Sequence, residues 1–367
     1  MIIQYVNLAN QYRLEKKKLL KIIDKVLLKG TYVGGDEVEL FEKNVAKFCN
    51  TKYCVALNSG TDALVMALHC LGVRRGDEVI TTPNSFIAST AVIVHLGAIP
   101  VFVDVKNDQN IDPNQIEKKI TKKTKVIMPV HLTGRMCEMD KIMSIAKKYN
   151  LKVVEDAAQS IGSMFNEKKS GSYGDVGCFS AHPLKNLNAM GDSGYLTTNS
   201  KKISELVKSL RSHGMTNRNI VNNFGYVSRM DNLQAAILNF RLKNLKNIIE
   251  KRRRNAGLYF KYLDKNNIYF AEENNKEFNT YHTFVIQVNN RNKLKNYLIK
   301  KGISTAIHYP IPIHLQPAAK KLNYKKGDFE RTEEQAGRIL TLPINQSLKK
   351  EQIIFIAKVV NSFFDDK

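Results

Sequence analysis

The sequence lacks the features that would assign it to several special classes of protein. No apolar run reaches the roughly 18 residues that a membrane-spanning helix requires. The start of the chain has no basic segment followed by an apolar core, so we expect no signal peptide. The five cysteines are odd in number, scattered and never arranged as C-x-x-C. This argues against a disulfide scaffold or a structural zinc site and favours a reducing cytoplasm.

Common nucleotide- and metal-binding patterns are missing as well. Neither G-x-x-x-x-G-K-[ST] nor G-x-G-x-x-G occurs, so a P-loop and a Rossmann dinucleotide site have no support. His131, His182 and His213 do not share the spacing of metal ligands, and we expect no metal.

Acidic residues are few relative to basic ones. Lysine and arginine number 57 against 34 aspartates and glutamates, which gives a formal charge of +23. Such an excess indicates either nucleic-acid binding or a lysine-rich solvated surface. The lysines are spread along the whole chain, and no basic motif with interleaved aromatics accompanies them. The sequence therefore favours the solvated surface, with no nucleic-acid partner, and the charge would help to attract an anionic substrate.

What is present is the composition of an ordinary globular protein, long enough at 367 residues for about two domains. Strand-like apolar runs alternate with helical patterns through the first two-thirds of the chain. The expected strands are 54–57, 78–81, 100–104, 125–130 and 152–156, with helices that include 61–68, 88–96 and 139–149. This alternation predicts an α/β fold with a mostly parallel sheet, whose ligands bind at the carboxyl ends of the strands.

The last third of the chain has a different pattern. One long helical stretch, about 232–262, leads into an expected strand at 282–288, an expected helix at 294–301, the segment 303–308 and a final expected helix at 350–363. We therefore predict a large domain over residues 1–244 and a smaller α+β domain over residues 245–367.

An aspartate at a strand end and a lysine downstream suggest a cofactor. Asp156 ends an apolar run, and Lys185 follows in a Ser/Pro-rich segment. Such a pair suits pyridoxal 5′-phosphate (PLP), with lysine as the Schiff-base amine and aspartate as the partner of the pyridine nitrogen. Lys185 would have to be partly desolvated, because an ordinary lysine pKa of about 10.4 keeps the amine charged. Taken singly, an exposed loop aspartate and a surface lysine would explain the two residues.

A turn between a strand and a helix could bind the phosphate of such a cofactor. Ser59, Gly60 and Thr61 lie in this turn. Glycine lets the backbone approach an anion closely, and the helix N-terminus attracts phosphate. Ser180 could share the same phosphate. Plain helix capping is the alternative for these hydroxyl residues.

Two further segments offer side chains for a ligand. Phe86 could stack on a planar ring, or it could be an ordinary core aromatic. The Pro-rich segment 307–317 carries His308, Tyr309 and His314. Its prolines fix the backbone, which suits either a loop that presents side chains to a ligand or a rigid connection with exposed imidazoles.

Taken in order, these motifs resemble the PLP-dependent nucleotide-sugar aminotransferases of the DegT/DnrJ/StrS family over essentially the whole chain. The segments that carry the resemblance are 34–42 (GGDEVELFE), 58–64 (NSGTDAL), 97–104 (GAIPVFVD), 129–134 (PVHLTG), 154–159 (VEDAAQ), 174–180 (GDVGCFS), 183–187 (PLKNL), 191–194 (GDSG) and 228–236 (SRMDNLQAA). The resemblance rests on the number and order of the motifs, because no single motif is specific enough to identify the family.

The resemblance implies fold type I of PLP enzymes, the aspartate aminotransferase fold, in a homodimer with active sites at the subunit interface. Lys185 would form the Schiff base, Asp156 would hold the pyridine nitrogen and Gln159 would lie near the ring hydroxyl. The remaining implied cofactor contacts are Ser59, Gly60, Thr61 and Ser180 at the phosphate and Phe86 on the ring.

The resemblance also implies contacts with the substrate and across the dimer. Arg229 would reach the partner subunit's site, although this chain has Val227 where many members have asparagine. The substrate contacts would include Gly34, His308, Tyr309 and His314.

The implied reaction is a ping-pong transamination in which L-glutamate supplies the amino group and a ketone on a nucleotide-linked hexose accepts it. Segments 228–234 and 308–317 resemble the branch that converts dTDP-3-oxo-6-deoxyhexoses to 3-amino-3,6-dideoxy sugars for surface polysaccharides such as O-antigen. Amination at C4 of a UDP-, dTDP- or GDP-4-keto-6-deoxyhexose is the alternative, and a PLP-binding regulator or scaffold is the non-enzyme alternative. Some relatives carry histidine in place of the Schiff-base lysine and are dehydrases, so the retained Lys185 favours transamination.

Overall fold

The computed structural model describes residues 2–365, and its centre is a seven-stranded sheet in the order β1-β9-β8-β5-β4-β2-β3. The strands are parallel from β8 to β3, whereas β9 runs antiparallel to both β1 and β8. The sheet consists of β1 (Tyr53–Leu57), β2 (Glu78–Thr81), β3 (Ile99–Phe102), β4 (Thr124–Ile127), β5 (Lys152–Asp156), β8 (Val176–Ser180) and β9 (Gly194–Thr198). This is the α/β architecture that the alternation of strands and helices predicts.

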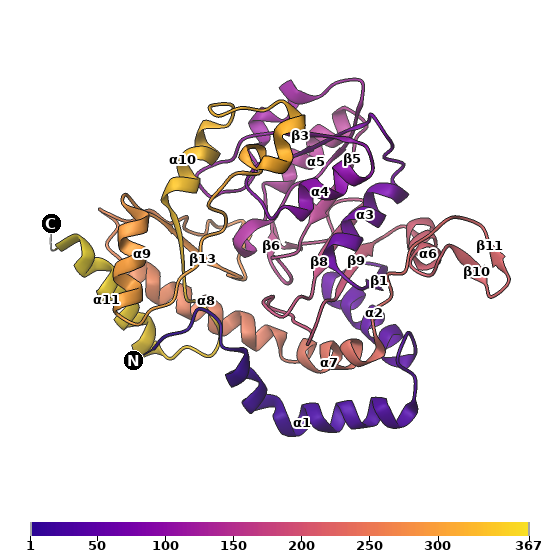
Figure 1. Ribbon diagram of the computed structural model, residues 1–367, viewed down its shortest axis with the longest axis horizontal. Helices are drawn as coiled ribbons and strands as arrows, with labels where there is room; N and C mark the ends of the chain where they lie inside the picture. The colour runs from indigo at the N-terminus through magenta and orange to yellow at the C-terminus, as the bar shows by residue number, and fades with distance from the viewer. Residues whose placement is uncertain (1, 366–367) are drawn as a thin grey trace.

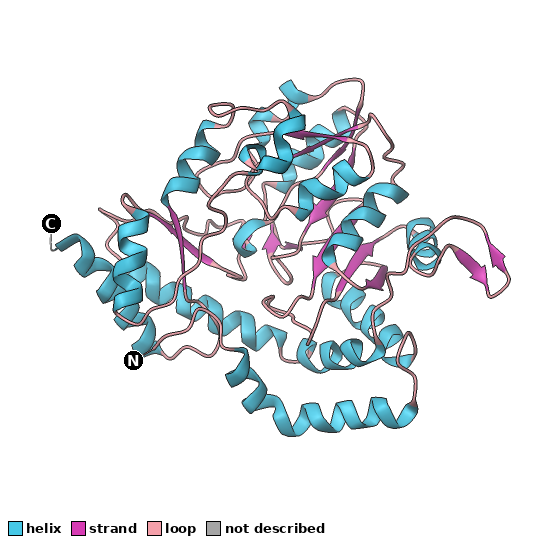
Figure 2. Cartoon of the chain, in the orientation of Figure 1, coloured by secondary structure: helices cyan, strands magenta, loops and turns pink. Residues whose placement is uncertain are grey.

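Helices surround this sheet and form a second layered unit at the C-terminal end of the chain (Figures 1 and 2). The α-helices are α1 (Leu8–Lys29), α2 (Asp36–Cys49), α3 (Gly60–Cys70), α4 (Ala88–His95), α5 (Met139–Lys148), α6 (Lys201–Leu210), α7 (Asn232–Leu242), α8 (Leu245–Tyr262), α9 (Arg291–Lys300), α10 (Glu330–Arg338) and α11 (Lys350–Asp365). None of the helices in the described part of the chain is long and apolar enough to cross a membrane.

Both faces of the large sheet are buried, and β1 shows why. Successive side chains of a strand point to opposite faces. Cys54 and Ala56 pack in one apolar cluster with residues of α2 and α7, while Val55 and Leu57 pack in another with residues of α3 and α6. A strand that is buried on both sides reads as a continuous apolar run, which is how this strand appears in the sequence.

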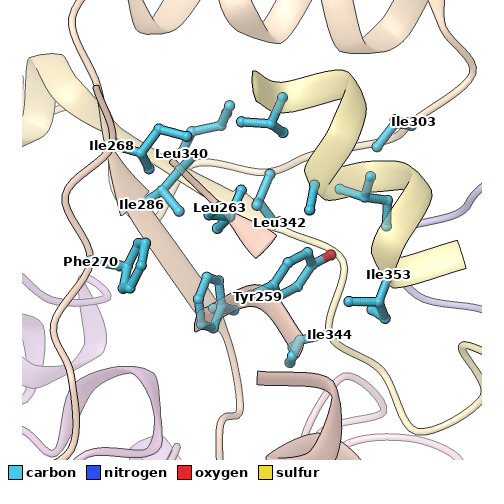
Figure 3. Packing of buried hydrophobic residues seen from close by; sticks show 14 of the residues in the cluster. Tyr259, Leu263, Ile268, Phe270, Ile286, Ile303, Leu340, Leu342, Ile344 and Ile353 are labelled. Carbon is cyan, nitrogen blue, oxygen red and sulfur yellow. The ribbon is translucent and has the colours of Figure 1, made fainter. Parts of the chain in front are cut away.

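The C-terminal part of the chain builds its own apolar core (Figure 3). Strands β13 (Phe284–Gln287) and β14 (Ile339–Leu342) pair antiparallel, and α8, α9 and α11 pack against them. Ile3 joins this core from the other end of the sequence, because its backbone pairs with Gly302 and Ser304. The proposed division of the chain at residues 244 and 245 stays a prediction.

Shorter strands form two further small sheets. β6 (Met164–Phe165), β7 (Lys168–Lys169) and β12 (Glu277–Phe278) form a small sheet, and β10 (Met215–Asn217) and β11 (Ile220–Val221) form a hairpin that projects beside α6 (Figure 1).

The structure corrects one expectation. The stretch 232–262 is two helices, because a turn at Lys243 and Asn244 ends α7 and starts α8. The turn lets α7 pack on α2 while α8 packs on α11. In the segment 303–308, isolated bridges join Ile303 to Ile3 and Ala306 to Thr341.

Candidate active site

A cavity of about 460 Å³ lies at the carboxyl ends of the parallel strands, as expected for a sheet of this kind. The large unit lines it with side chains that follow β1, β2, β5 and β8. The facing wall comes from the C-terminal half and from the start of the chain, with Tyr5, Arg252, His282, His308, Tyr309 and Asn345.

Asp156, the last residue of β5, is buried at one side of this cavity. The Ser89 hydroxyl donates a hydrogen bond of 2.7 Å to Oδ2, and the backbone N–H of Ala158 donates one of 3.2 Å to Oδ1. Burial raises the pKa of Asp156, while these hydrogen bonds and the Lys185 ammonium act in the opposite direction. The result is an oriented, desolvated carboxyl group that a cationic ligand atom would stabilise.

Lys185 lines the same cavity from the turn that follows β8. Its backbone N–H donates to the carbonyl of His182 at 2.9 Å, which closes the turn. Burial lowers the pKa of Lys185 to about 8, and the nearby Asp156 carboxylate opposes this shift. A useful fraction of the amine is therefore neutral near neutral pH, as a nucleophilic lysine requires.

The N-terminus of α3 meets the ends of β8 and β9 closely enough to make an anion cradle. A Cβ added at Gly60 would lie 2.8 Å from the Cβ of Ser180, and one added at Gly194 would lie 2.1 Å from the carbonyl carbon of Ser59. The Ser59 side chain caps the helix by accepting from the backbone N–H of Asp62 at 3.0 Å. The first N–H groups of a helix have no partner within it and attract phosphate.

Gln159, Phe86 and Tyr309 line the same cavity as Asp156. The Gln159 side-chain oxygen accepts from the backbone N–H of Thr133 at 2.8 Å, and its amide nitrogen lies 3.5 Å from the Tyr309 hydroxyl. Phe86 is 56% exposed, and its ring centre is 6.0 Å from that of Tyr309. Burial raises the pKa of Tyr309 to about 12, so this hydroxyl stays protonated.

These residues fit PLP. The cavity brings together a desolvated amine, a buried carboxyl group, a helix N-terminus with small residues for a phosphate, and an aromatic ring at the mouth. His308 also lines the cavity as a neutral imidazole, because burial lowers its pKa to about 4. Its Nδ1 lies 2.9 Å from the Thr341 hydroxyl.

Three expected site residues lie outside this cavity. His314 is 2% exposed and contacts the Phe329 ring. Its Nε2 lies 3.0 Å from the Glu333 carboxylate, so the imidazole makes its contacts within the protein interior. Gly34 sits in a left-handed turn before α2, and Arg229 is an exposed residue ahead of α7. The structure therefore does not bring these three residues to the cavity of their own chain.

Sequence reasoning missed several cavity residues: Tyr5, Ser85, Ser89, Arg252, His282 and Asn345. Tyr5 reaches the cavity because the first residues pair with the C-terminal unit. Arg252 belongs to the basic run 251–254, whose pattern indicates a solvated helix. No local signal separates this buried arginine from its neighbours.

Comparisons with known proteins agree with this geometry. Residues 13–362 match the model of the DegT/DnrJ/EryC1/StrS aminotransferase family. A pleiotropic regulatory protein from Geobacillus stearothermophilus is 36% identical, over 99% of both chains. The dTDP-3-amino-3,6-dideoxy-alpha-D-galactopyranose transaminase of Aneurinibacillus thermoaerophilus is 38% identical, over 95% of this chain and 96% of that one.

A solved structure gives the same answer for the fold. The X-ray structure of DesV from S. venezuelae, in complex with a ketimine intermediate, has a TM-score of 0.96 and 34% identity, and the match covers 99% of this chain and 98% of that one. The family resemblance, the fold class and the cofactor predicted from the sequence are thereby confirmed. The chain belongs to the DegT/DnrJ/EryC1/StrS aminotransferase family and is a PLP-dependent sugar aminotransferase.

Proposed function

We propose that the protein moves the amino group of L-glutamate onto the C3 ketone of a dTDP-linked 3-oxo-6-deoxyhexose, giving a 3-amino-3,6-dideoxy sugar for a surface polysaccharide or another glycan. Transamination rests on one observation, the meeting of Lys185 and Asp156 in a cavity that also holds an anion cradle. The choice of C3 is supported by the name of the Aneurinibacillus relative. A cytoplasmic location also stays a prediction.

The side chains divide the work of this reaction. PLP, when bound, supplies an electron sink for the bond-breaking step. Lys185 Nζ would anchor the cofactor and, once the amino donor has displaced it as a neutral amine, would accept the proton from the α-carbon of the donor. Asp156 would hold a proton on the ring nitrogen, and Gln159 would orient the ring hydroxyl. Ser59, Gly60, Thr61 and Ser180 would bind the phosphate, and Phe86 would cover the ring.

The anion cradle gives a direct test of phosphate binding. Gly194→Ala would place a methyl group against the backbone of Ser59 and Gly60, so the turn would have to move. We expect roughly a tenfold or greater rise in the dissociation constant of PLP, which corresponds to about 1.4 kcal/mol. Fluorescence titration of the apoenzyme measures it. Gly257→Ala is the control, because a Cβ on this α8 glycine meets nothing within 4 Å, and unchanged PLP affinity in both variants would contradict the cradle.

We propose a homodimer as the working state. Large apolar side chains are exposed on α1 (Leu14 and Leu28), in the segment between β11 and α7 (Phe224 and Val227), and at Leu184, which lines the cavity, and Met190. A second copy of the chain would cover these side chains, as a self-complementary interface does. Arg229 and Gly34 would then serve the partner subunit's cavity. Sedimentation should give about twice the chain mass of 41.7 kDa, and Phe224→Asp should shift it toward the monomer. A wild-type monomer would contradict this proposal.

A panel of nucleotide sugars tests the substrate. Holoenzyme with L-glutamate is offered dTDP-linked 3-keto and 4-keto 6-deoxyhexoses and their UDP and GDP counterparts, and the products are identified by mass and NMR. We expect at least roughly a hundredfold preference in kcat/KM for a dTDP-3-keto sugar, a difference of about 2.7 kcal/mol. Preference for a 4-keto sugar would show that the enzyme aminates C4 and not C3. No turnover with any sugar would favour the regulatory role named for the Geobacillus relative.

A further inference from the structure

The cavity contains a buried positive charge that the roles given above do not use. Arg252, on α8, lines the cavity and is only 5% exposed. Its Nη1 donates to the carbonyls of Tyr281 and His282, both at 3.1 Å, and its Nη2 donates to the Gln346 side chain at 3.1 Å. Nε has no partner, and no carboxylate among residues 2–365 forms an ion pair with this guanidinium.

Other buried arginines of the chain are neutralised or lie away from any cavity. Arg135 pairs with Glu277, and Arg241 pairs with Glu15. Arg291 resembles Arg252 in having two backbone carbonyl partners and an unpartnered Nε, but it lines no described cavity. A buried charge without a counter-ion is costly, and this suits a residue whose counter-ion arrives with a ligand.

The surroundings of Arg252 favour an anion. His282 lies beside it on the cavity wall, and the buried Nδ1 of this imidazole has no partner in the described chain. Burial and the positive charges of Lys185 and Arg252 hold the pKa of His282 well below its ordinary value, so the ring is neutral and can offer a hydrogen bond. The cavity acids Asp156 and Asp192 form no ion pair with Arg252 in the described residues.

We propose that Arg252, with His282 beside it, binds a carboxylate of the amino donor; this inference rests on the proposed transamination. The cofactor phosphate already has its cradle at α3, on the large unit. The diphosphate of a nucleotide sugar lies between the nucleoside and the hexose, so it suits an open groove better than a guanidinium that is only 5% exposed. A carboxylate is terminal, and its two oxygens match the planar guanidinium.

The proposal predicts that Arg252 serves only one half of the reaction. The keto sugar carries no carboxylate and should not need this residue. With the PLP form and L-glutamate alone, Arg252→Gln should raise the L-glutamate concentration for half-maximal rate by roughly 10- to 100-fold, the range for a lost charged hydrogen bond. Arg252→Lys keeps the positive charge but lacks the planar guanidinium. Its L-glutamate concentration for half-maximal rate should therefore lie between those of Arg252→Gln and wild type. The rate of the aminated enzyme with the keto sugar should change less than about threefold, within the context-dependence of unrelated contacts.

Binding of a non-reacting ligand supplies a second readout. Calorimetry with glutarate should show the same 10- to 100-fold loss for Arg252→Gln, and glutaramide should bind wild type weakly. Arg291→Gln, the matched buried arginine, should leave the L-glutamate response unchanged. L-alanine keeps only the α-carboxylate, and 4-aminobutyrate keeps only the terminal carboxylate. If Arg252→Gln weakens the response to only one of these two donors, the carboxylate of that donor is the group that Arg252 binds.

The outcomes separate this inference from the proposed function. If L-glutamate does not change the absorbance of wild-type holoenzyme, the proposed donor is wrong. If wild type responds and both Arg252 variants respond equally well, Arg252 only supports the fold and the inference is overturned. An equally large loss in the rate of aminated Arg252→Gln with the keto sugar would also overturn the inference, because it would assign Arg252 to the diphosphate of the sugar. If Arg252→Gln fails to fold, the L-glutamate response of Arg252→Lys still tests the inference.

Discussion

Lys185→Ala is expected to lose at least roughly 10³-fold in turnover, because the variant lacks both the covalent anchor and the group that moves the proton. The structure supports both roles: the amine lines the cavity beside Asp156, and burial lowers its pKa to about 8. The visible absorbance of the lysine-linked cofactor should disappear when PLP is added to the variant. Steady-state rates and absorbance spectra measure the two effects.

A second lysine provides the control for burial alone. Lys169 is partly buried, contacts the Phe48 ring, and also has its pKa lowered by burial, but it lies outside the cavity. Lys169→Ala should keep the absorbance and most of the turnover. Full transaminase activity in Lys185→Ala would end the assignment of this residue, whatever the control shows.

Much of the fold and part of the site follow from local sequence. β2 and β5 have the predicted bounds, because apolar runs between polar turns define a strand buried on both faces. Asp156 could be found since it ends such a run, where parallel sheets bind ligands. Lys185 could be found only through its neighbours, because a chain with 57 basic residues gives no reason to select one lysine.

The rest of the site depends on contacts between distant segments. His308 and His314 belong to one Pro-rich segment, yet one lines the cavity and the other turns inward to Glu333. Arg252 is buried because residues 281–282 and 346 come to it from later in the chain. Tyr5 reaches the cavity because Ile3 pairs with the segment around Ile303. No pattern within a few residues contains this information.

Asp156→Asn is expected to separate cofactor attachment from catalysis. The amide keeps the shape of the side chain but cannot hold a positive charge on the ring nitrogen, so turnover should fall by roughly 10²-fold or more. Lys185 is untouched, and the absorbance of the attached cofactor should therefore remain. Asp192→Asn removes the other cavity carboxylate and should have little effect on turnover. Equal turnover in wild type and Asp156→Asn would contradict the role of Asp156.

The same substitution should have the opposite effect on the stability of the apoenzyme. Burial raises the pKa of Asp156 above its ordinary 3.8 in the folded state. At neutral pH the ionised carboxylate therefore lowers the free energy of unfolding, and Asp156→Asn should raise the Tm of the apoenzyme. Below pH 3.8 the group is protonated in both states, so this advantage should vanish as the pH falls. PLP should also remove it, because a protonated ring nitrogen compensates the buried carboxylate of the wild type. A variant that gains stability without the cofactor and loses turnover with it would show that this carboxylate is retained for chemistry at the expense of the fold.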